Sequence, residues 1–262
     1  MARARAGTVS ELATPAAVID LDRMHANLDR MADYARAREL VLRPHVKTHK
    51  TPSLAAAQLR RGAAGVTVAT ARELRVMGDV ADDILLAYPT VAGGRLDAAR
   101  DLADGTRLTV ALDSAEAARA LAEAMRDAGR EADVLVEIDV GMRRCGVTTP
   151  PAAVRLATLI GALDGVRFRG VMFYPGHIRD PVRDQDPALE ALSAQLAVFL
   201  DALGQAGHDV AVVSGGSTPT AYRSHEVAGV TEIRPGTYIF NDRTTAAVGG
   251  CAWDDCAYTI LA

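Results

Sequence analysis

The sequence predicts an α/β fold, a closed (β/α)8 TIM barrel, from three observations. Short runs rich in β-branched residues alternate with longer amphipathic runs, eight such units follow one another, and no low-complexity linker separates them. The 262 residues, 49% hydrophobic and 24% charged, match the size and composition of one such barrel. We therefore expect a single barrel over residues 22–245.

Eight segments are predicted as the barrel strands, with helices between them. In chain order the strands are 41–47, 65–69, 83–89, 107–113, 132–140, 166–174, 210–216 and 230–236. A helix over 22–38 precedes the first strand. The helix predicted over 114–129 carries its own boundary signals, because Ser114 can cap its first turn and Gly129 can end it.

Two segments at the ends of the chain do not fit the barrel. Residues 15–21 are predicted as a strand before the first helix, and residues 251–262 end in an apolar run. We expect both to belong to a second, β-rich domain that is truncated in this chain. Residues 1–21 would contribute a strand to that domain, and residues 246–262 would begin it.

Composition and charge exclude several classes of protein. The net charge is −4, from 29 basic and 33 acidic residues, without a long basic block, so nucleic acid is not an expected partner. The start "MARARAG" has no apolar stretch behind it, and no run of eighteen apolar residues is present, so we expect a cytoplasmic protein without a membrane partner. The three cysteines lack CxxC spacing, which supports neither a disulfide framework nor a structural zinc site.

Glycine and hydroxyl residues follow the seventh and eighth predicted strands, where barrels commonly bind phosphate. The motifs are "SGGSTPT" (214–220) and "RPGTY" (234–238). Glycine lets the backbone approach an anion closely. In these loops the glycines are Gly215, Gly216 and Gly236, and the hydroxyl donors are Ser217, Thr218 and Thr237. A plain turn is the alternative, but the position after the seventh strand favours a phosphate site.

Lys47 ends the first predicted strand, at alternate positions with Arg43 and His45. Lysines at strand ends are ordinarily solvated. Burial beside another cation would lower the pKa of this amine, as a lysine that forms a Schiff base requires. A phosphate site facing such a lysine indicates pyridoxal 5′-phosphate. Lys50 is the weaker candidate for the Schiff base, because it would point to the opposite face of the strand from Lys47 and lies past the expected strand end.

Histidines offer a competing interpretation, a metal site. His45, His49 and His177 could bind zinc together with a cysteine. However, the spacing between His45 and His49 falls on a strand and turn instead of a helix face, so it is a weak indication of a metal site.

Four motifs resemble one known family in the same order along nearly the whole chain. They are "RPHVKTHK" (43–50), "DVGMRRCGV" (139–147), "SGGSTPT" (214–220) and "RPGTYIFND" (234–242). They resemble the D-threonine aldolase and D-serine dehydratase family, in the alanine-racemase-like group of pyridoxal phosphate enzymes. The resemblance implies that Lys47 holds the cofactor as a Schiff base, and that Arg144 faces the pyridine nitrogen while Tyr174 lies in the cofactor pocket. It places the following residues around the phosphate: Ser214, Gly215, Gly216, Ser217, Thr218, Gly236, Thr237 and Tyr238.

The resemblance also implies a metal and a partner. An arginine at the pyridine nitrogen leaves that nitrogen unprotonated, which makes the ring a weaker electron sink. In the family a divalent metal, Mn²⁺ or Zn²⁺, binds the substrate's β-hydroxyl group. Its histidine and cysteine ligands lie in the C-terminal β domain, so we name no metal ligand in this chain. The family also implies a homodimer.

We expect a lyase that cleaves small D-β-hydroxy-α-amino acids into glycine and an aldehyde, as a D-threonine aldolase does. "FYPGH" (173–177) favours this reaction over its alternative, the dehydration of D-serine or D-threonine. A racemase is less favoured, because we find no second base for the opposite face of the substrate. A protein that binds pyridoxal phosphate without turnover is the third possibility.

Overall fold

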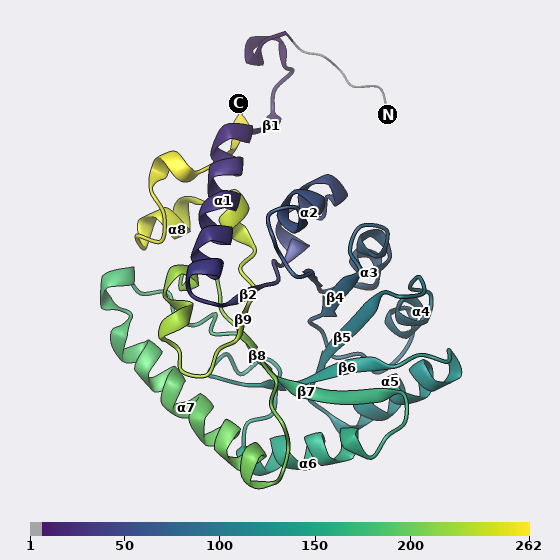
Figure 1. The fold of residues 1–262 in the computed structure, drawn as a ribbon. Helices are drawn as coiled ribbons and strands as arrows, with labels where there is room; N and C mark the ends of the chain where they lie inside the picture. Colours follow the sequence, from purple (N-terminus) through teal and green to yellow (C-terminus); the bar gives the residue numbers. More distant parts are fainter. Residues whose placement is uncertain (1–6) are drawn as a thin grey trace.

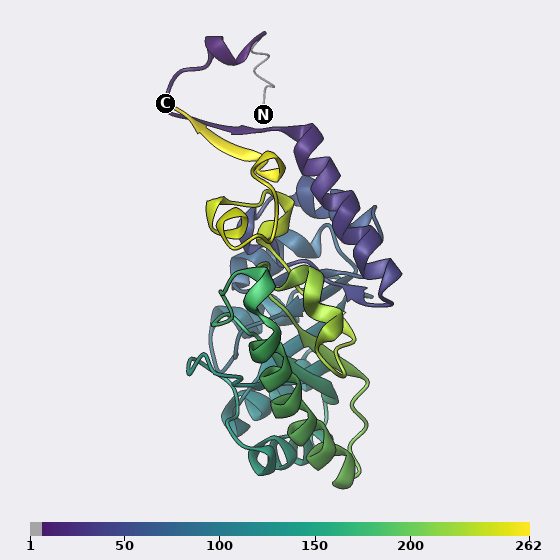
Figure 2. The same cartoon turned by 90° about the vertical axis from the view of Figure 1, so that its left-hand side faces the viewer.

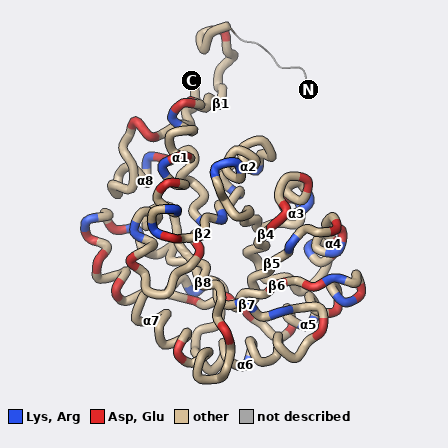
Figure 3. Tube along the Cα trace, viewed as in Figure 1, with Lys and Arg blue, Asp and Glu red and all other residues tan. Residues whose placement is uncertain are grey.

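Eight parallel strands form one curled sheet surrounded by helices (Figure 1). The structure, a computed structural model, describes residues 7–262. Within that range the strand order is β2-β9-β8-β7-β6-β5-β4-β3, so each strand from β3 to β9 lies beside the next one along the chain. The predicted barrel is confirmed. Lys and Arg residues alternate with Asp and Glu around the outer helices (Figure 3).

The strands and helices lie where the sequence predicts them, with shorter strands at the two ends of the series. The strands are β2 (Val41–Leu42), β3 (Val66–Val68), β4 (Asp83–Leu86), β5 (Arg107–Leu112), β6 (Ala132–Ile138), β7 (Val166–Phe173), β8 (Val212–Gly215) and β9 (Glu232–Ile233). The helices are α1 (Leu21–Ala37), α2 (Pro52–Leu59), α3 (Ala71–Gly78), α4 (Gly94–Arg100), α5 (Ala115–Asp127), α6 (Pro150–Gly161), α7 (Asp186–Gln205) and α8 (Arg243–Ala247).

The barrel closes between β2 and β3 through the chain that follows β2. His45 and Thr67 form an isolated parallel bridge. The backbone N–H of Thr67 donates to the carbonyl oxygen of Pro44 at 2.8 Å, and that of Ala64 donates to Leu42 at 2.9 Å. These bonds satisfy the backbone groups that an open sheet edge would leave unpaired.

Helix α5 shows how local sequence sets an element boundary. The Ser114 side chain accepts a hydrogen bond from the backbone N–H of Ala117 at 3.2 Å, as an N-cap should. Gly129 follows the helix with φ at +65°, a conformation that side chains with a Cβ adopt at a cost. Both predicted boundary signals are confirmed.

Among the described residues, α7 is the one helix long and apolar enough, by length and composition alone, to cross a membrane. Its position is that of a barrel helix beside α6. One face is buried, through Leu189, Leu192, Leu196, Phe199 and Leu203. That spacing of three and four residues is the pattern of a helix that covers a core.

Alternate residues of each strand point to opposite faces of the sheet, either outward to the core under the helices or inward to the barrel interior. A small apolar cluster stands apart from the large core under the helices, and consists of Leu85, Ala111, Leu135 and Met172. Four residues on neighbouring strands face one another at one level of the barrel: Glu137, Met172, Ser214 and Glu232. The interior is therefore polar at this level, toward the carboxyl ends of the strands.

The two ends of the described chain form a separate sheet. Strand β1 (Ala16–Ile19) pairs antiparallel with β10 (Tyr258–Leu261), from Ala16 opposite Leu261 to Ile19 opposite Tyr258. Figure 2 shows this pair projecting beyond the barrel. The prediction that both end segments are β structure outside the barrel is confirmed.

Candidate active site

A pocket opens at the carboxyl ends of the strands, where barrel active sites lie. Its lining consists of His45, Lys47, Ala87, Glu137, Arg144, Met172, Tyr174, Gly216, Ser217, Thr218, Pro219, Arg234, Gly236 and Thr237. The pocket thus brings together eight of the predicted site residues from five different loops, together with six others.

The loops that follow β8 and β9 form one wall of the pocket. The backbone N–H of Thr237 donates to Oγ1 of Thr218 at 3.1 Å, which joins the two loops. Within residues 7–262, the backbone N–H groups of 216–218 have no acceptor. A Cβ at Gly236 would stand 3.0 Å from the backbone oxygen of His45, so only a residue without a side chain fits comfortably. Unpaired N–H groups beside glycine suit a phosphate group.

Lys47 also lines the pocket, from the short 3₁₀ helix η2 (Val46–Thr48). Its Nζ is 5.4 Å from the centre of the Tyr174 ring. The pKa of Lys47 is lowered, first by burial of the amine and then by the charges of Arg144 and Arg234. This is the shift that an amine nucleophile needs at neutral pH.

The geometry around Lys47 differs from the predicted strand over 41–47. Strand β2 ends at Leu42, and Pro44 has no N–H to donate to a ladder. The His45 ring then caps η2, because its Nδ1 accepts from the Lys47 backbone N–H at 3.3 Å. Consequently Lys47 is not part of the strand, and the inward and outward alternation of strand residues does not apply to it. The expected burial of Lys47 inside the barrel is therefore wrong. The residue as a whole is exposed, and only its amine end is enclosed enough in the pocket for burial to lower its pKa.

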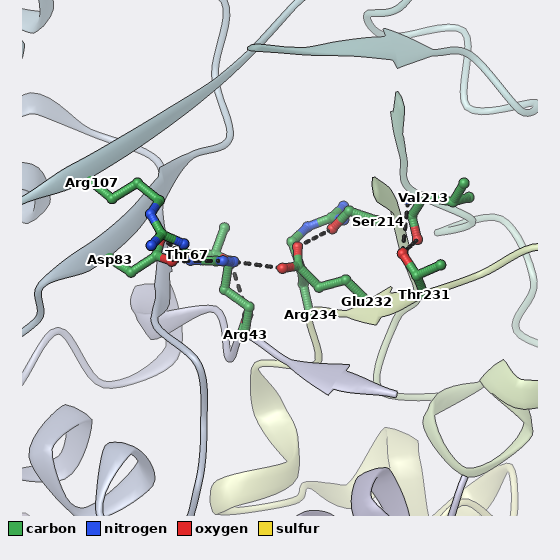
Figure 4. Close-up of polar contacts among 9 residues, drawn as sticks. All are labelled: Arg43, Thr67, Asp83, Arg107, Val213, Ser214, Thr231, Glu232 and Arg234. Atoms are coloured by element: carbon green, nitrogen blue, oxygen red, sulfur yellow. Dashed lines mark hydrogen bonds and ion pairs between the residues drawn. The ribbon is translucent and has the colours of Figure 1, made fainter. Parts of the chain in front are cut away.

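Arg43, by contrast, is buried inside the barrel in a network of charges (Figure 4). Its guanidinium pairs with Asp83 on β4, and its Nε donates to Glu232 on β9 at 2.7 Å. The Ser214 hydroxyl donates to Glu232 and accepts from Arg234. Arg43 therefore connects strands across the seam of the barrel, and it does not line the pocket.

Two groups on the pocket floor have strongly shifted pKa values. Burial lowers the pKa of Arg234 to about 10, so this residue is still charged at neutral pH. Burial, together with the charges of Lys47 and Arg234, lowers the pKa of His45 well below its ordinary value. His45 is thus a neutral imidazole, and because Nδ1 accepts a hydrogen bond, we assign the proton to Nε2.

Arg144 and Tyr174 also line the pocket and contact each other. The Arg144 guanidinium carbon lies 5.2 Å from the Tyr174 ring centre, close to the corresponding distance for Lys47. Both cations are within the range of a cation–π interaction with the same ring. The Tyr174 ring therefore contacts both positive groups.

Three predicted site residues do not line the pocket. Ser214 belongs to the buried charge network below it. A Cβ at Gly215 would overlap the Phe173 ring at 2.0 Å, so this glycine serves packing. The Tyr238 side chain turns away, and its hydroxyl accepts from Gln58 Nε2 at 3.0 Å while burial raises its pKa.

Two charged residues of the pocket, Glu137 and Arg234, were not predicted as site residues from the sequence. Both occupy inward positions, Glu137 on β6 and Arg234 directly after β9. The alternation of inward and outward positions could have identified them, because a charged residue on a buried strand is unusual.

The histidines of the competing metal interpretation do not come together. His49 bonds to the Thr51 backbone and to Gln58, outside the pocket. His177 is exposed, beside Gly141. In the part of the chain that the structure describes, no group of three or more His, Cys, Asp or Glu residues could hold a metal ion.

Comparisons with known proteins agree with this geometry. Residues 19–244 match the family "Alanine racemase, N-terminal domain". The chain is 39% identical to D-threo-3-hydroxyaspartate dehydratase of Delftia sp. (strain HT23), over 97% of the chain and 68% of that protein. It is 32% identical to D-threonine aldolase of Arthrobacter sp., over 92% of the chain and 64% of that protein.

A solved structure shows the same fold. The D-threonine aldolase from Filomicrobium marinum superposes with a TM-score of 0.86 and 35% identity, covering 91% of this chain and 65% of that one. The chain thus spans about two thirds of the length of these relatives.

Proposed function

The chain belongs to the alanine racemase N-terminal domain family, and on that premise we propose that it is a pyridoxal phosphate-dependent lyase of D-β-hydroxy-α-amino acids. One observation carries the proposal: the Lys47 amine and the unpaired N–H groups of residues 216–218 open into the same pocket. An amine and an anion cradle in one pocket are what this cofactor requires.

The residues present fit the cofactor. Residues 216–218, with Thr237, would hold its phosphate, and Lys47 would hold its aldehyde carbon as a Schiff base. Arg144 would lie at the ring nitrogen. When bound, the cofactor would supply the electron sink for the bond that breaks at the α-carbon of the substrate.

The protein's own groups supply proton transfer and orientation. Because its pKa is lowered, a larger fraction of Lys47 is the neutral amine, which can act as a nucleophile and can accept a proton. His45 is a neutral imidazole whose ring bonds to the Thr67 backbone and accepts from the Lys47 backbone N–H, so it holds the chain at Lys47 in place. Arg234, held by Ser214 and the carbonyl oxygen of Phe173, keeps a fixed positive charge on the floor.

We propose the aldolase reaction, in which the Cα–Cβ bond breaks and glycine and an aldehyde are released. The support comes from relatives named D-threonine aldolase and 3-hydroxy-D-aspartate aldolase. Dehydration is the second candidate, favoured by a relative of higher identity named D-threo-3-hydroxyaspartate dehydratase. One solved structure of that dehydratase, of a C353A mutant, is the metal-free form, which implies that the enzyme also has a metal-bound form. We therefore propose that this protein also uses a divalent metal, Mn²⁺ or Zn²⁺.

Incubation with D-threonine separates the two reactions. The protein would be loaded with pyridoxal 5′-phosphate and assayed with and without added Mn²⁺ or Zn²⁺. Acetaldehyde and glycine in equal amounts support the aldolase, whereas 2-oxobutanoate and ammonia support the dehydratase. D-3-hydroxyaspartate should be tested in parallel, since relatives are named for it. Bound cofactor without any product would support the third candidate, a cofactor-binding protein without turnover.

We also propose that the protein acts as a homodimer. The proposal rests on the resemblance to the family, and the exposed apolar side chains of Ile19, Tyr258 and Ile260 around the β1–β10 pair are consistent with it. Sedimentation velocity should show a dimer, and a monomer at all concentrations would contradict it.

A further inference from the structure

Gln185 is a buried residue whose side chain connects two loops at the carboxyl end of the barrel. It directly precedes α7, and its exposed fraction is 0%. Its Nε2 donates two hydrogen bonds, to the carbonyl oxygen of Asp180 at 3.0 Å and to that of Pro219 at 3.3 Å. Asp180 lies in the loop after β7, and Pro219 lies in the loop after β8, where it lines the pocket. One amide group therefore joins the two loops.

The two bonds determine which end of the Gln185 amide faces the carbonyl oxygens. The reverse orientation would place Oε1 against two other acceptors, so the position of Nε2 follows from the contacts. Oε1 is buried and has no donor among residues 7–262. A buried unpaired oxygen costs free energy, so the acceptor end of the amide does not stabilise the fold. Gln185 therefore contributes through its donor end.

The segment that carries Gln185 is itself held in place. The Gln185 carbonyl oxygen accepts from two backbone N–H groups in the first turn of α7, at 3.1 and 3.0 Å. Arg223, in η4 (Ala221–Glu226) directly after the loop that follows β8, donates to the Val182 carbonyl oxygen at 2.8 Å. The loop after β8 is thus tied to this segment at two places, and Gln185 provides the tie nearer to the pocket.

The bond from Gln185 sets the direction in which the Pro219 carbonyl group points. Within the described range 7–262, no backbone N–H donates to this oxygen, so Gln185 is its donor. Gln185 does not line the pocket, whereas Pro219 and residues 216–218 do. A carbonyl oxygen that faced a bound phosphate would repel it, because both carry negative charge. The bond to Gln185 therefore turns the oxygen toward a buried amide that lies outside the pocket.

We propose that Gln185 is a positioning residue for binding of the cofactor phosphate, because it keeps the Pro219 carbonyl oxygen turned away from that anion. The inference rests on the proposed function, which places the phosphate at residues 216–218. Gln185 touches neither the cofactor nor the substrate in this role. Without its Nε2 donor, the Pro219 carbonyl group is free to turn toward the phosphate, and the affinity for the phosphate group falls.

A comparison of two ligands tests the proposal. Pyridoxal 5′-phosphate and pyridoxal have the same aldehyde, but pyridoxal has no phosphate. Their dissociation constants would be measured by absorbance titration for the unsubstituted chain and for Gln185→Met, which has a similar shape and no donor. We expect Gln185→Met to weaken the binding of pyridoxal 5′-phosphate about five- to tenfold, as for the loss of a hydrogen bond. The binding of pyridoxal should change less than about twofold, because it lacks the group that the loop holds.

Equal losses for the two ligands in Gln185→Met would overturn the inference, since general damage to the pocket does not depend on a phosphate group. Gln195→Met provides the matched control. Gln195 also lies on α7, and its Nε2 donates to the carbonyl oxygen of Asp139 at 3.0 Å, in the loop after β6. Gln195→Met should leave the ratio of the two dissociation constants unchanged. A change in this ratio as large as that in Gln185→Met would also overturn the inference.

Gln185→Asn keeps the test open if Gln185→Met does not fold. Asparagine retains the buried amide, but its shorter side chain draws the donor back from Pro219. The loss of affinity should again be larger for pyridoxal 5′-phosphate than for pyridoxal, and equal losses would overturn the inference. Failure of the proposed function gives a different result: the unsubstituted chain itself would not bind pyridoxal 5′-phosphate, and the inference would fall with its premise.

Discussion

The backbone N–H of Thr237 donates to the Thr218 hydroxyl at 3.1 Å, and this single bond joins the two loops of the anion cradle. The loops come from β8 and β9, and each supplies groups to the same wall of the pocket. Because Thr218 uses its hydroxyl oxygen as an acceptor, its side chain holds the cradle in shape.

Thr218→Val should weaken the binding of pyridoxal 5′-phosphate about five- to tenfold, because valine has nearly the same shape but cannot accept the Thr237 bond. Fluorescence titration of the cofactor measures the change. Thr158→Val is the control, since Thr158 lies on α6 and its hydroxyl bonds to His208, outside the pocket. Equal affinity of Thr218→Val and the unsubstituted chain would contradict the role of the bond.

Lys47→Ala should abolish the visible absorbance of the bound cofactor, because the Schiff base requires the Nζ amine. The melting temperature should remain within a few degrees, since the Lys47 side chain is exposed. Lys50→Ala is the matched control: Lys50 pairs with Glu73 at 3.2 Å outside the pocket, and its loss should leave the absorbance intact. Absorbance that persists in Lys47→Ala but disappears in Lys50→Ala would move the attachment site to Lys50.

Arg43→Met should destabilise the fold by about 3–5 kcal/mol, because it leaves the carboxylates of Asp83 and Glu232 buried without their cation. Urea denaturation measures the change in the free energy of unfolding. Arg107→Met also removes a partner of Asp83, at 3.4 Å, but from a side chain that is 68% exposed. We expect it to cost less than about 1 kcal/mol. Similar losses for the two variants would show that the network does not depend on burial.

The rate of cofactor attachment should rise with pH with a midpoint below 10.5, the ordinary pKa of lysine, because the pKa of Lys47 is lowered. The sign follows from the reaction, since only the deprotonated amine attacks the aldehyde. Arg144→Gln should move the midpoint upward by removing a nearby positive charge. Stopped-flow absorbance at a series of pH values measures both midpoints.

The opposite outcome would be informative as well. A midpoint at or above 10.5 in the unsubstituted chain would mean that Lys47 gains no activation from its surroundings. An unchanged midpoint in Arg144→Gln, with Arg143→Gln as its control, would mean that Arg144 does not act on the amine.

Local patterns were enough to predict the eight strands, the boundaries of α5 and the positions of the two cradle loops. Strand period, capping residues and glycine all act over a few neighbouring residues, so they can be recognised in an isolated segment. The expected strand over 41–47 was too long, because a proline and a histidine cap together redirect the chain before Lys47.

Closure of the barrel determined which residues from distant parts of the chain meet in the pocket. Glu137, Arg234 and His45 come from different strands or the segments directly after them, and they become neighbours in one pocket only when the curled sheet meets itself at the bridge between His45 and Thr67. Burial and charge interactions depend on distances between groups far apart in the chain, and those distances are properties of the packed molecule. For this reason the motifs could suggest a lysine and a phosphate loop, while the pKa of that lysine and the bond from Gln185 to Pro219 emerged only from the three-dimensional arrangement.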